Sequence, residues 1–227
     1  GESLMDILGN ARGNITRQAN KKLRRERIMG VAQDMIANEG LEAFTLSGLA
    51  TETGVSRPTI HNLFGKKEDI VKELADELVR GLQSIMSKGA LGDPIESATF
   101  YVLSLASLYK SKESFYRAAY VAGDKLGIYD DRESPTGLVQ QSINISRLCV
   151  EAAHSAGCLL GNIQSSDLTM KLYDCHRVGR NDWVKGYIDL DEFCRQTLVG
   201  CLMVYAADAT PELHKRLCEE IARLNSN

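Results

Sequence analysis

Long apolar runs are missing from this sequence. No apolar stretch approaches the roughly 20 residues that a membrane-spanning helix needs, so we expect no membrane partner. The N-terminus also lacks a basic start followed by an apolar segment, the pattern of a secretory signal. A hydrophobic fraction of 44% is ordinary for a globular domain, and we expect the protein to be cytoplasmic.

Cysteine motifs are absent as well. All six cysteines lie from Cys149 onward and none forms a Cys-x-x-Cys pair, so we expect no disulfide framework. His154 and Cys158 have the i, i+4 spacing that places two side chains on one helix face. Two ligands do not make a metal site, and no metal and no cofactor are expected. A metal or thiol sensor stays an alternative that metal analysis of the purified protein would test.

The short motifs of common enzymes are also missing. The sequence has no Gly-x-Ser-x-Gly, no His-Glu-x-x-His and no phosphate-binding glycine loop. Its four histidines lack an obvious nucleophile partner, and an acidic pair such as Glu219–Glu220 fits a solvated helix surface. We therefore expect no catalytic residues and do not expect an enzyme.

What the sequence does have is helical periodicity along almost its whole length. Apolar residues recur every three to four positions, and no sustained alternation or Asn-Gly turn indicates strands. Three of the four prolines lie at plausible helix starts. The pattern predicts an all-α fold. The predicted helices are residues 21–38, 45–53, 56–64, 66–88, 94–110, 112–126, 135–156, 165–186, 189–207 and 211–224.

Positive charge gathers near the N-terminus although the whole chain has a net charge of −3. Between residues 10 and 27 the only acidic residue is Glu26, and the basic ones are Arg12, Arg17, Lys21, Lys22, Arg24, Arg25 and Arg27. Such a cluster indicates a segment that meets a polyanion, with a solvated tail as the alternative.

Residues 46–65, LSGLATETGVSRPTIHNLFG, have the pattern of a helix-turn-helix. A small Ala50 allows a close helix crossing, Gly54 suits the left-handed backbone of the turn, and Ile60 faces inward. Leu49, Val55 and Leu63 are expected to complete the small core, with Thr45 and Ser56 as helix caps. A plain helical hairpin inside a bundle is the alternative, but the outward face is polar and basic residues precede it.

With Ile60 inward, a helical step of about 100° places polar side chains outward, where they suit a major groove. Thr59 suits a thymine methyl or a phosphate, and Asn62 can pair with adenine. His61 and Lys67 suit phosphates, as do the helix N-termini at Thr45 and Ser56. The full set of predicted DNA-binding residues is Thr45, Ser56, Arg57, Pro58, Thr59, His61, Asn62 and Lys67.

The stretch from Arg25 to Ile70 resembles the DNA-binding domain of the TetR family of bacterial regulators. The resemblance rests on Ile28, Ala32, Gly40, Thr45, Leu49-Ala50, Gly54-Val55-Ser56, Thr59-Ile60, Phe64, Lys67-Glu68 and Ile70. His61 departs from the family's usual tyrosine, and Leu63 from a histidine or tyrosine. Pro58 replaces a residue that is often small, but in the first turn it removes no needed hydrogen bond.

The resemblance implies a homodimer that binds palindromic double-stranded operator DNA and is usually a repressor. It also implies a helical C-terminal domain that binds a small molecule and thereby moves the two DNA-binding heads apart. The expected organisation is a flexible basic arm at 1–20, a three-helix DNA-binding domain at 21–68, and a helical effector-binding and dimerisation domain at 69–227. The functional boundary is expected inside the fourth helix.

Residues 183–193, WVKGYIDLDEF, resemble the family's junction between its last two long helices, which implies a dimer interface nearby. The interface residues predicted on this basis are Phe193, Leu198, Leu202 and Tyr205, and an ordinary intramolecular core helix is the alternative. Aromatic residues of the second half could line a cavity for a small apolar or aromatic effector. This candidate pocket comprises Phe100, Tyr101, Phe115, Tyr116, Tyr120, Tyr173 and Trp183, each of which could instead be plain core.

The sequence thus predicts a DNA-binding regulator that an effector releases from its operator. The alternative is a helix-turn-helix repressor without an effector, controlled by a protein partner or by its own level. A thermal-shift screen against metabolites separates these two, because a ligand that prefers the native state raises its stability.

Overall fold

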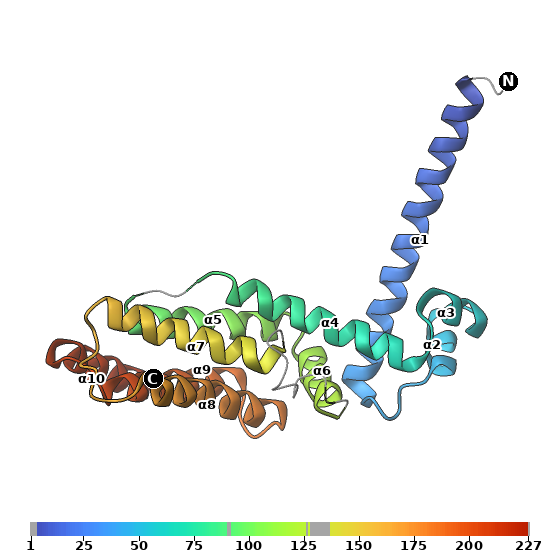
Figure 1. The fold of residues 1–227 in the computed structure, drawn as a ribbon. Coiled ribbons are helices and arrows are strands. Elements are labelled where there is room, and N and C mark those ends of the chain that lie inside the picture. Colours follow the sequence, from blue (N-terminus) through green and yellow to red (C-terminus); the bar gives the residue numbers. More distant parts are fainter. Residues whose placement is uncertain (1–3, 90–91, 126, 128–136, 227) are drawn as a thin grey trace. The chain divides into compact units, whose positions relative to one another are not determined.

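The computed structural model describes residues 4–89, 92–125, 127 and 137–226, and these residues form ten α-helices (Figure 1). The helices are α1 (Leu4–Glu39), α2 (Leu46–Thr53), α3 (Arg57–Phe64), α4 (Lys67–Met86), α5 (Pro94–Ser111), α6 (Glu113–Lys125), α7 (Leu138–Ser155), α8 (Ser165–Val184), α9 (Leu190–Ala206) and α10 (Pro211–Asn225). In this described part, extended backbone pairing is limited to one bridge between Leu159 and Ala209. The all-α prediction is confirmed.

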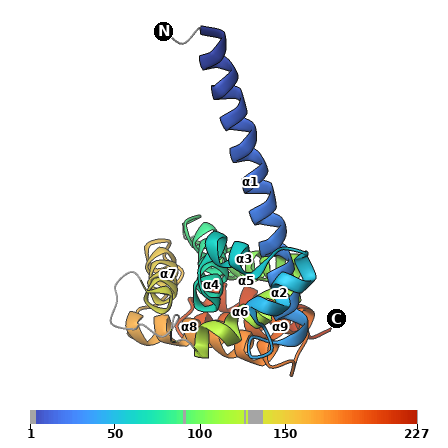
Figure 2. The same ribbon diagram turned by 90° about the vertical axis from the view of Figure 1, so that its right-hand side faces the viewer.

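Most helix boundaries lie close to the predicted ones, and α1 is the exception. It begins at Leu4, whereas the sequence predicted a start near residue 21. Residues 4–20 contain no proline, and Leu8, Ala11 and Ile15 repeat at helical spacing, so the helix continues upstream of the charge cluster. Both views show this part of α1 extending beyond α2 and α3 (Figures 1 and 2). The predicted end at 126 and start at 135 lie outside the described residues.

The chain divides into two compact units, Gly1–Leu74 and Ala75–Asn227, and the division falls inside α4. The N-terminal unit therefore holds α1 to α3 and the first turns of α4. The C-terminal unit holds the rest of α4 and all later helices.

The N-terminal unit is built around a small apolar core. Ile28 and Ala32 of α1 are buried, as are Phe44, Leu49 of α2 and Ile60 of α3. Among them, Leu49 and Ile60 are positions that the sequence pattern placed in this core. Three short helices can therefore pack together without a large domain around them.

Arg25 links the helices that surround this core. Its guanidinium donates two hydrogen bonds of 2.6 Å to the carboxylate of Glu73 in α4 and lies 4.6 Å from the ring centroid of Phe64 in α3. The bond to Glu73 raises the pKa of Arg25. One side chain thus joins three helices of the N-terminal unit.

Helix α9 is central to the C-terminal unit, because α5, α8 and α10 all pack against it (Figure 1). Its Leu198, Cys201, Leu202 and Tyr205 belong to one buried apolar cluster. Burying a leucine side chain of this kind contributes about 1.5–3 kcal/mol. The cluster extends into α5, α7, α8 and α10, so it is the main core of this unit.

Two carboxylates organise the ends of these helices. Asp208 is 1% exposed and accepts hydrogen bonds from the backbone N–H groups of Gly161, Asn162 and Ile163, at 2.9, 2.8 and 3.2 Å. The turn after α9 is thereby tied to the loop between α7 and α8. Such an arrangement satisfies a buried carboxylate and three backbone donors together.

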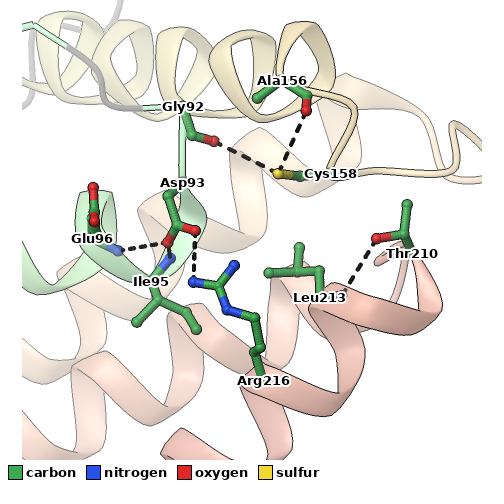
Figure 3. A network of polar contacts seen from close by, with 9 residues as sticks. All are labelled: Gly92, Asp93, Ile95, Glu96, Ala156, Cys158, Thr210, Leu213 and Arg216. Atoms are coloured by element: carbon green, nitrogen blue, oxygen red, sulfur yellow. Dashed lines mark hydrogen bonds and ion pairs between the residues drawn. The ribbon is translucent and has the colours of Figure 1, made fainter.

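The second carboxylate, Asp93, caps α5 and joins it to α10 (Figure 3). Its Oδ1 accepts from the backbone N–H groups of Ile95 and Glu96, and its Oδ2 lies 2.8 Å from the guanidinium of Arg216. Partial burial alone would raise the pKa of Asp93, but the backbone bonds and Arg216 together lower it. The start of α5 is therefore fixed by a cap and an ion pair that share one side chain.

Candidate DNA-binding surface and effector cavity

The turn between α2 and α3 has the geometry that the sequence predicted. The Thr45 hydroxyl accepts from the backbone N–H of Gly48, and the Ser56 hydroxyl accepts from that of Thr59, so both are N-caps. Gly54 follows α2 with φ of 66°, in the left-handed region where a side chain is costly. The two short helices are therefore held at a fixed angle by local backbone chemistry.

Helix α3 separates its inner and outer faces sharply. Ile60 is 0% exposed, and Leu63 is half-buried at the edge of the core. Val55, in the turn before the helix, is also buried. Facing outward are Arg57, Pro58, His61 and Asn62, all exposed, together with the half-buried Thr59. The outer face is thus polar and free of intramolecular packing, as a major-groove reading face must be.

The remaining predicted DNA-binding residues flank this face. Ser56 and Thr45 are exposed at the starts of α3 and α2, and the Ser56 Oγ lies 2.7 Å from the Thr59 Oγ1. Lys67 is the first residue of α4, and its half-buried side chain places the ammonium 6.0 Å from the ring centroid of Phe44. The structure therefore brings six of the predicted residues together on α3 and its N-cap, namely Ser56, Arg57, Pro58, Thr59, His61 and Asn62. Thr45 is the N-cap of α2, and Lys67 begins α4.

The basic cluster divides into two kinds of residue. Arg25 is committed to Glu73, and a guanidinium nitrogen of Arg27 donates to the carbonyl oxygen of Thr53 at the end of α2. The others are exposed along α1, namely Arg12, Arg17, Lys21, Lys22 and Arg24. Only Lys22 of these has an ion pair in the described part of the chain, a 3.9 Å contact with Glu26. Exposed cations of this kind are suited to phosphate contacts.

The C-terminal unit contains a cavity of about 90 Å³ between α4, α5, α6, α7, α8 and α9. Its lining includes three of the predicted pocket residues, Tyr101, Tyr120 and Tyr173. The other four lie outside it. Phe115 and Tyr116 are buried at 4% and 5% exposure, and the half-buried Phe100 packs its ring edge against Tyr101.

Trp183, the fourth, is 0% exposed and belongs to the core. Its ring stacks on Tyr109 with centroids 4.6 Å apart, and its Nε1 donates to a carboxylate oxygen of Glu113 at 3.2 Å. For these four residues the prediction from sequence gave too much weight to aromatic character. Large rings fill the space between helices, and the cavity forms where they leave a gap.

The imidazole and guanidinium groups of the cavity were missed from the sequence. They come mainly from α8, where His176 and Arg180 follow Tyr173 and share one helix face. Tyr109 and Tyr120 add two hydroxyl groups whose oxygens lie 2.7 Å apart. Burial raises the pKa of both tyrosines, so both stay protonated at neutral pH. The i, i+3, i+7 spacing of Tyr173, His176 and Arg180 is the signal that could have found this face.

The predicted dimer-interface residues lie inside the protomer. Phe193, Leu198, Leu202 and Tyr205 are 1%, 5%, 0% and 2% exposed. They pack against neighbouring helices of the same chain, so they cannot also form a surface for a partner. The apolar stripe that suggested an interface is instead the intramolecular core face of α9. Exposed apolar residues on α8 and α9 include Met170, Val178 and Met203.

Two findings bear on metal binding and on membrane association. Within the described residues, no three His, Cys, Asp or Glu side chains gather as a metal site would require. The described helices also include none that is both long and apolar enough to cross a membrane.

A helix-turn-helix whose reading face is exposed and polar defines a DNA-binding regulator. Residues 28–74 match the family described as bacterial regulatory proteins, tetR family. The resemblance to the TetR family seen in the sequence is therefore confirmed for residues 28–74, which lie within the N-terminal unit.

The similarity to solved structures covers the remaining helices as well. A TetR-family transcriptional regulator from Marinobacter aquaeolei VT8 has a TM-score of 0.67 and 18% identity, covering 88% of this chain and 98% of its own. The TetR-family protein CprB from S. coelicolor A3(2) has a TM-score of 0.62 and 18% identity, covering 89% and 97%. A gamma-butyrolactone receptor, described as ArpA-like, has a TM-score of 0.63 and 17% identity, covering 91% and 98%. No curated protein sequence matches the chain.

Proposed function

We propose that this protein is a homodimeric repressor that binds palindromic operator DNA through α2 and α3 and leaves it when a small molecule fills the C-terminal cavity. The observation that carries the DNA-binding part is the face of α3, where Arg57, His61 and Asn62 are exposed opposite a fully buried Ile60. A helix face that does not pack against the rest of the domain is available for base and phosphate contacts.

The two compact units support a division of labour. DNA binding is assigned to the unit ending at Leu74, with the exposed cations of α1 as added phosphate contacts. Effector binding and dimerisation are assigned to the unit from Ala75 onward, which holds the cavity. Because α4 belongs to both units, a change at its cavity end can reach the DNA-binding end. The effector shifts the equilibrium only as far as its affinities for the two states differ.

A small molecule as the signal is supported by the mostly apolar cavity, which is the form that ligand sites commonly take. One of the similar structures is itself described as a gamma-butyrolactone receptor. Two-fold symmetry is supported by the helix-turn-helix, since dimeric binders of this kind use paired half-sites about one helical turn apart.

The decisive experiment selects binding sites from a random duplex pool at moderate salt. The wild type is expected to enrich a palindrome, and an Asn62→Ala, Lys67→Ala double variant is expected to lose it. A matched control, Asn162→Ala with Lys110→Ala, removes the same residue types from exposed positions in the other unit and should enrich the same palindrome. If neither wild type nor control enriches any sequence, specific operator binding is ruled out.

Dimerisation and release need separate measurements. Sedimentation of the protein with its selected duplex should give two chains per palindrome. A metabolite panel is then screened by thermal shift, and each ligand that raises the melting temperature is added to the operator complex. A ligand that stabilises the protein and dissociates the complex supports release, whereas a complete absence of stabilising ligands favours a repressor controlled by a protein partner or by its own level.

A further inference from the structure

The walls of the C-terminal cavity carry positive charge without a compensating carboxylate. Arg177 and Arg180 of α8 both line it, and none of the lining residues is Asp or Glu. Arg177 is paired outside the lining, with a guanidinium nitrogen 3.1 Å from a carboxylate oxygen of Asp174. Arg180 has no ion pair within the described part of the chain. Its guanidinium lies 5.0 Å from the ring centroid of Tyr120.

A second polar group in the cavity also lacks a partner. The Nδ1 atom of His176 is buried and makes no hydrogen bond, while its Nε2 lies 3.7 Å from the Sγ of Cys201. A buried nitrogen without a partner costs free energy, so it marks a place where a ligand atom can bind. Burial and the nearby charge of Arg180 lower the pKa of His176 to about 4, so the ring is neutral at pH 7 and one of its nitrogens carries a proton.

The same region holds the hydroxyl groups of Tyr109 and Tyr120, and the guanidinium of Arg180 lies close to the Tyr120 ring. Guanidinium, imidazole and phenol groups thus converge from α5, α6 and α8. All three are hydrogen-bond donors, and guanidinium is the group that matches a carboxylate best.

The opposite walls are apolar. They include Leu82 and Ile85 of α4, Leu105 of α5 and Ile145 of α7. The volume of about 90 Å³ is smaller than the roughly 150 Å³ apolar cavity that holds benzene. A ligand that fits has a short apolar body and one compact polar end.

We propose that the cavity binds a small monocarboxylate, with its carboxylate on Arg180 and His176 and its apolar part against α4, α5 and α7. This inference rests on the proposed effector function and narrows it to one chemical class. The carboxylate of the ligand supplies the negative charge that the lining residues do not provide for Arg180. Specificity follows because a neutral analogue leaves the positive charge of Arg180 without an ionic partner in a largely apolar site.

The test uses the full-length protein and a panel of propionate, butyrate and isobutyrate, each paired with its neutral primary amide. Affinities are measured by calorimetry and checked by thermal shift. Wild type is expected to bind at least one carboxylate at least tenfold more tightly than the matching amide. Arg180→Met should remove that preference, and Arg180→Lys should restore part of it.

Arg177→Met is the matched control, because it removes a second cavity-lining arginine from the same helix, one that already has Asp174 as its partner. It should keep the preference for the carboxylate. Circular dichroism confirms that each variant is folded. The proposal is overturned if no carboxylate binds, if the amides bind as well, or if Arg180→Met binds carboxylates like the wild type.

Operator binding in the same samples separates this proposal from the proposed function. If a carboxylate binds through Arg180 and the operator complex is unchanged, the anion site stands and the release mechanism fails. If only neutral compounds bind and dissociate the complex, release stands and the carboxylate assignment fails.

Discussion

In the helix-turn-helix, different residues stabilise the fold and form the proposed binding surface, whereas at the C-terminal cavity the same residues do both. In α3, Ile60 holds the fold while Asn62, two positions later, lies exposed on the other face. In the C-terminal unit, Tyr109 stacks on the buried Trp183 and also lines the cavity. Surface contacts can therefore change in the first region without loss of stability, whereas a change around the cavity alters the packing that forms it.

The largest expected effect comes from breaking the aromatic stack beside the cavity. Trp183→Ala removes a fully buried ring that packs on Tyr109 and donates to Glu113, and we expect the free energy of unfolding to fall by about 3–5 kcal/mol. Circular dichroism during denaturant unfolding measures this without depending on tryptophan fluorescence.

Tyr187→Ala provides the control, since this ring is 74% exposed and its loss should change stability by less than about 0.5 kcal/mol. Cavity ligands should bind Trp183→Ala more weakly, because Tyr109 loses its support. If Trp183→Ala lost no stability, the residues that form the cavity would not be the ones that stabilise this unit.

The next effect is a pH dependence that originates in the cavity wall. The pKa of His176 is lowered from 6.5 to about 4 in the folded protein. Between these pH values the unfolded chain binds a proton that the folded chain does not, so stability is complete above pH 6.5 and falls as the pH drops toward 4. The full loss is about 3 kcal/mol at about 1.4 kcal/mol for each pKa unit.

Carboxylates also titrate in this range, so the useful quantity is the difference between wild type and a histidine variant. The unfolding free energy of His176→Gln should depend less on pH between 6.5 and 4. His214→Gln removes an exposed histidine and should reproduce the wild-type curve. Equal pH dependence in all three proteins would contradict the assignment of this loss to His176.

The contrast between the regions also explains what the sequence could predict. Caps, a turn glycine and inward apolar residues are local features, so Thr45, Gly54, Ser56 and Ile60 were all placed correctly from spacing. A cavity depends on how side chains from six helices fail to fill a space, and no local pattern encodes that. Trp183 and Phe115 were therefore assigned to the pocket although they are core, and His176 and Arg180 were overlooked.

Within the helix-turn-helix, stability should change while the reading face stays intact. Gly54→Ala places a side chain in the left-handed region at φ of 66° and is expected to cost about 1–2 kcal/mol. Gly54→Asn should cost less, because asparagine adopts this conformation more readily. Thermal unfolding measures both, and operator affinity at a temperature where each variant is folded should remain near wild type. The structure leaves room at this position, since no neighbouring atom lies within 4 Å of a Cβ added to Gly54. Equal destabilisation by Gly54→Asn and Gly54→Ala would therefore contradict the assignment of the cost to the left-handed backbone.

The smallest effect distinguishes a helix cap from an ion pair in the C-terminal unit. Asp93→Asn keeps an acceptor for the backbone N–H groups at the start of α5 but removes the charge that faces Arg216, so stability should fall by less than about 1 kcal/mol. Asp93→Ala removes both contacts and should cost about 0.5–2 kcal/mol. Denaturant unfolding at low and high salt measures the two parts, since salt weakens only the ion pair. If Asp93→Asn were as destabilising as Asp93→Ala, the ion pair rather than the cap would fix the start of α5, and charge would matter to this unit's packing as much as apolar contact does.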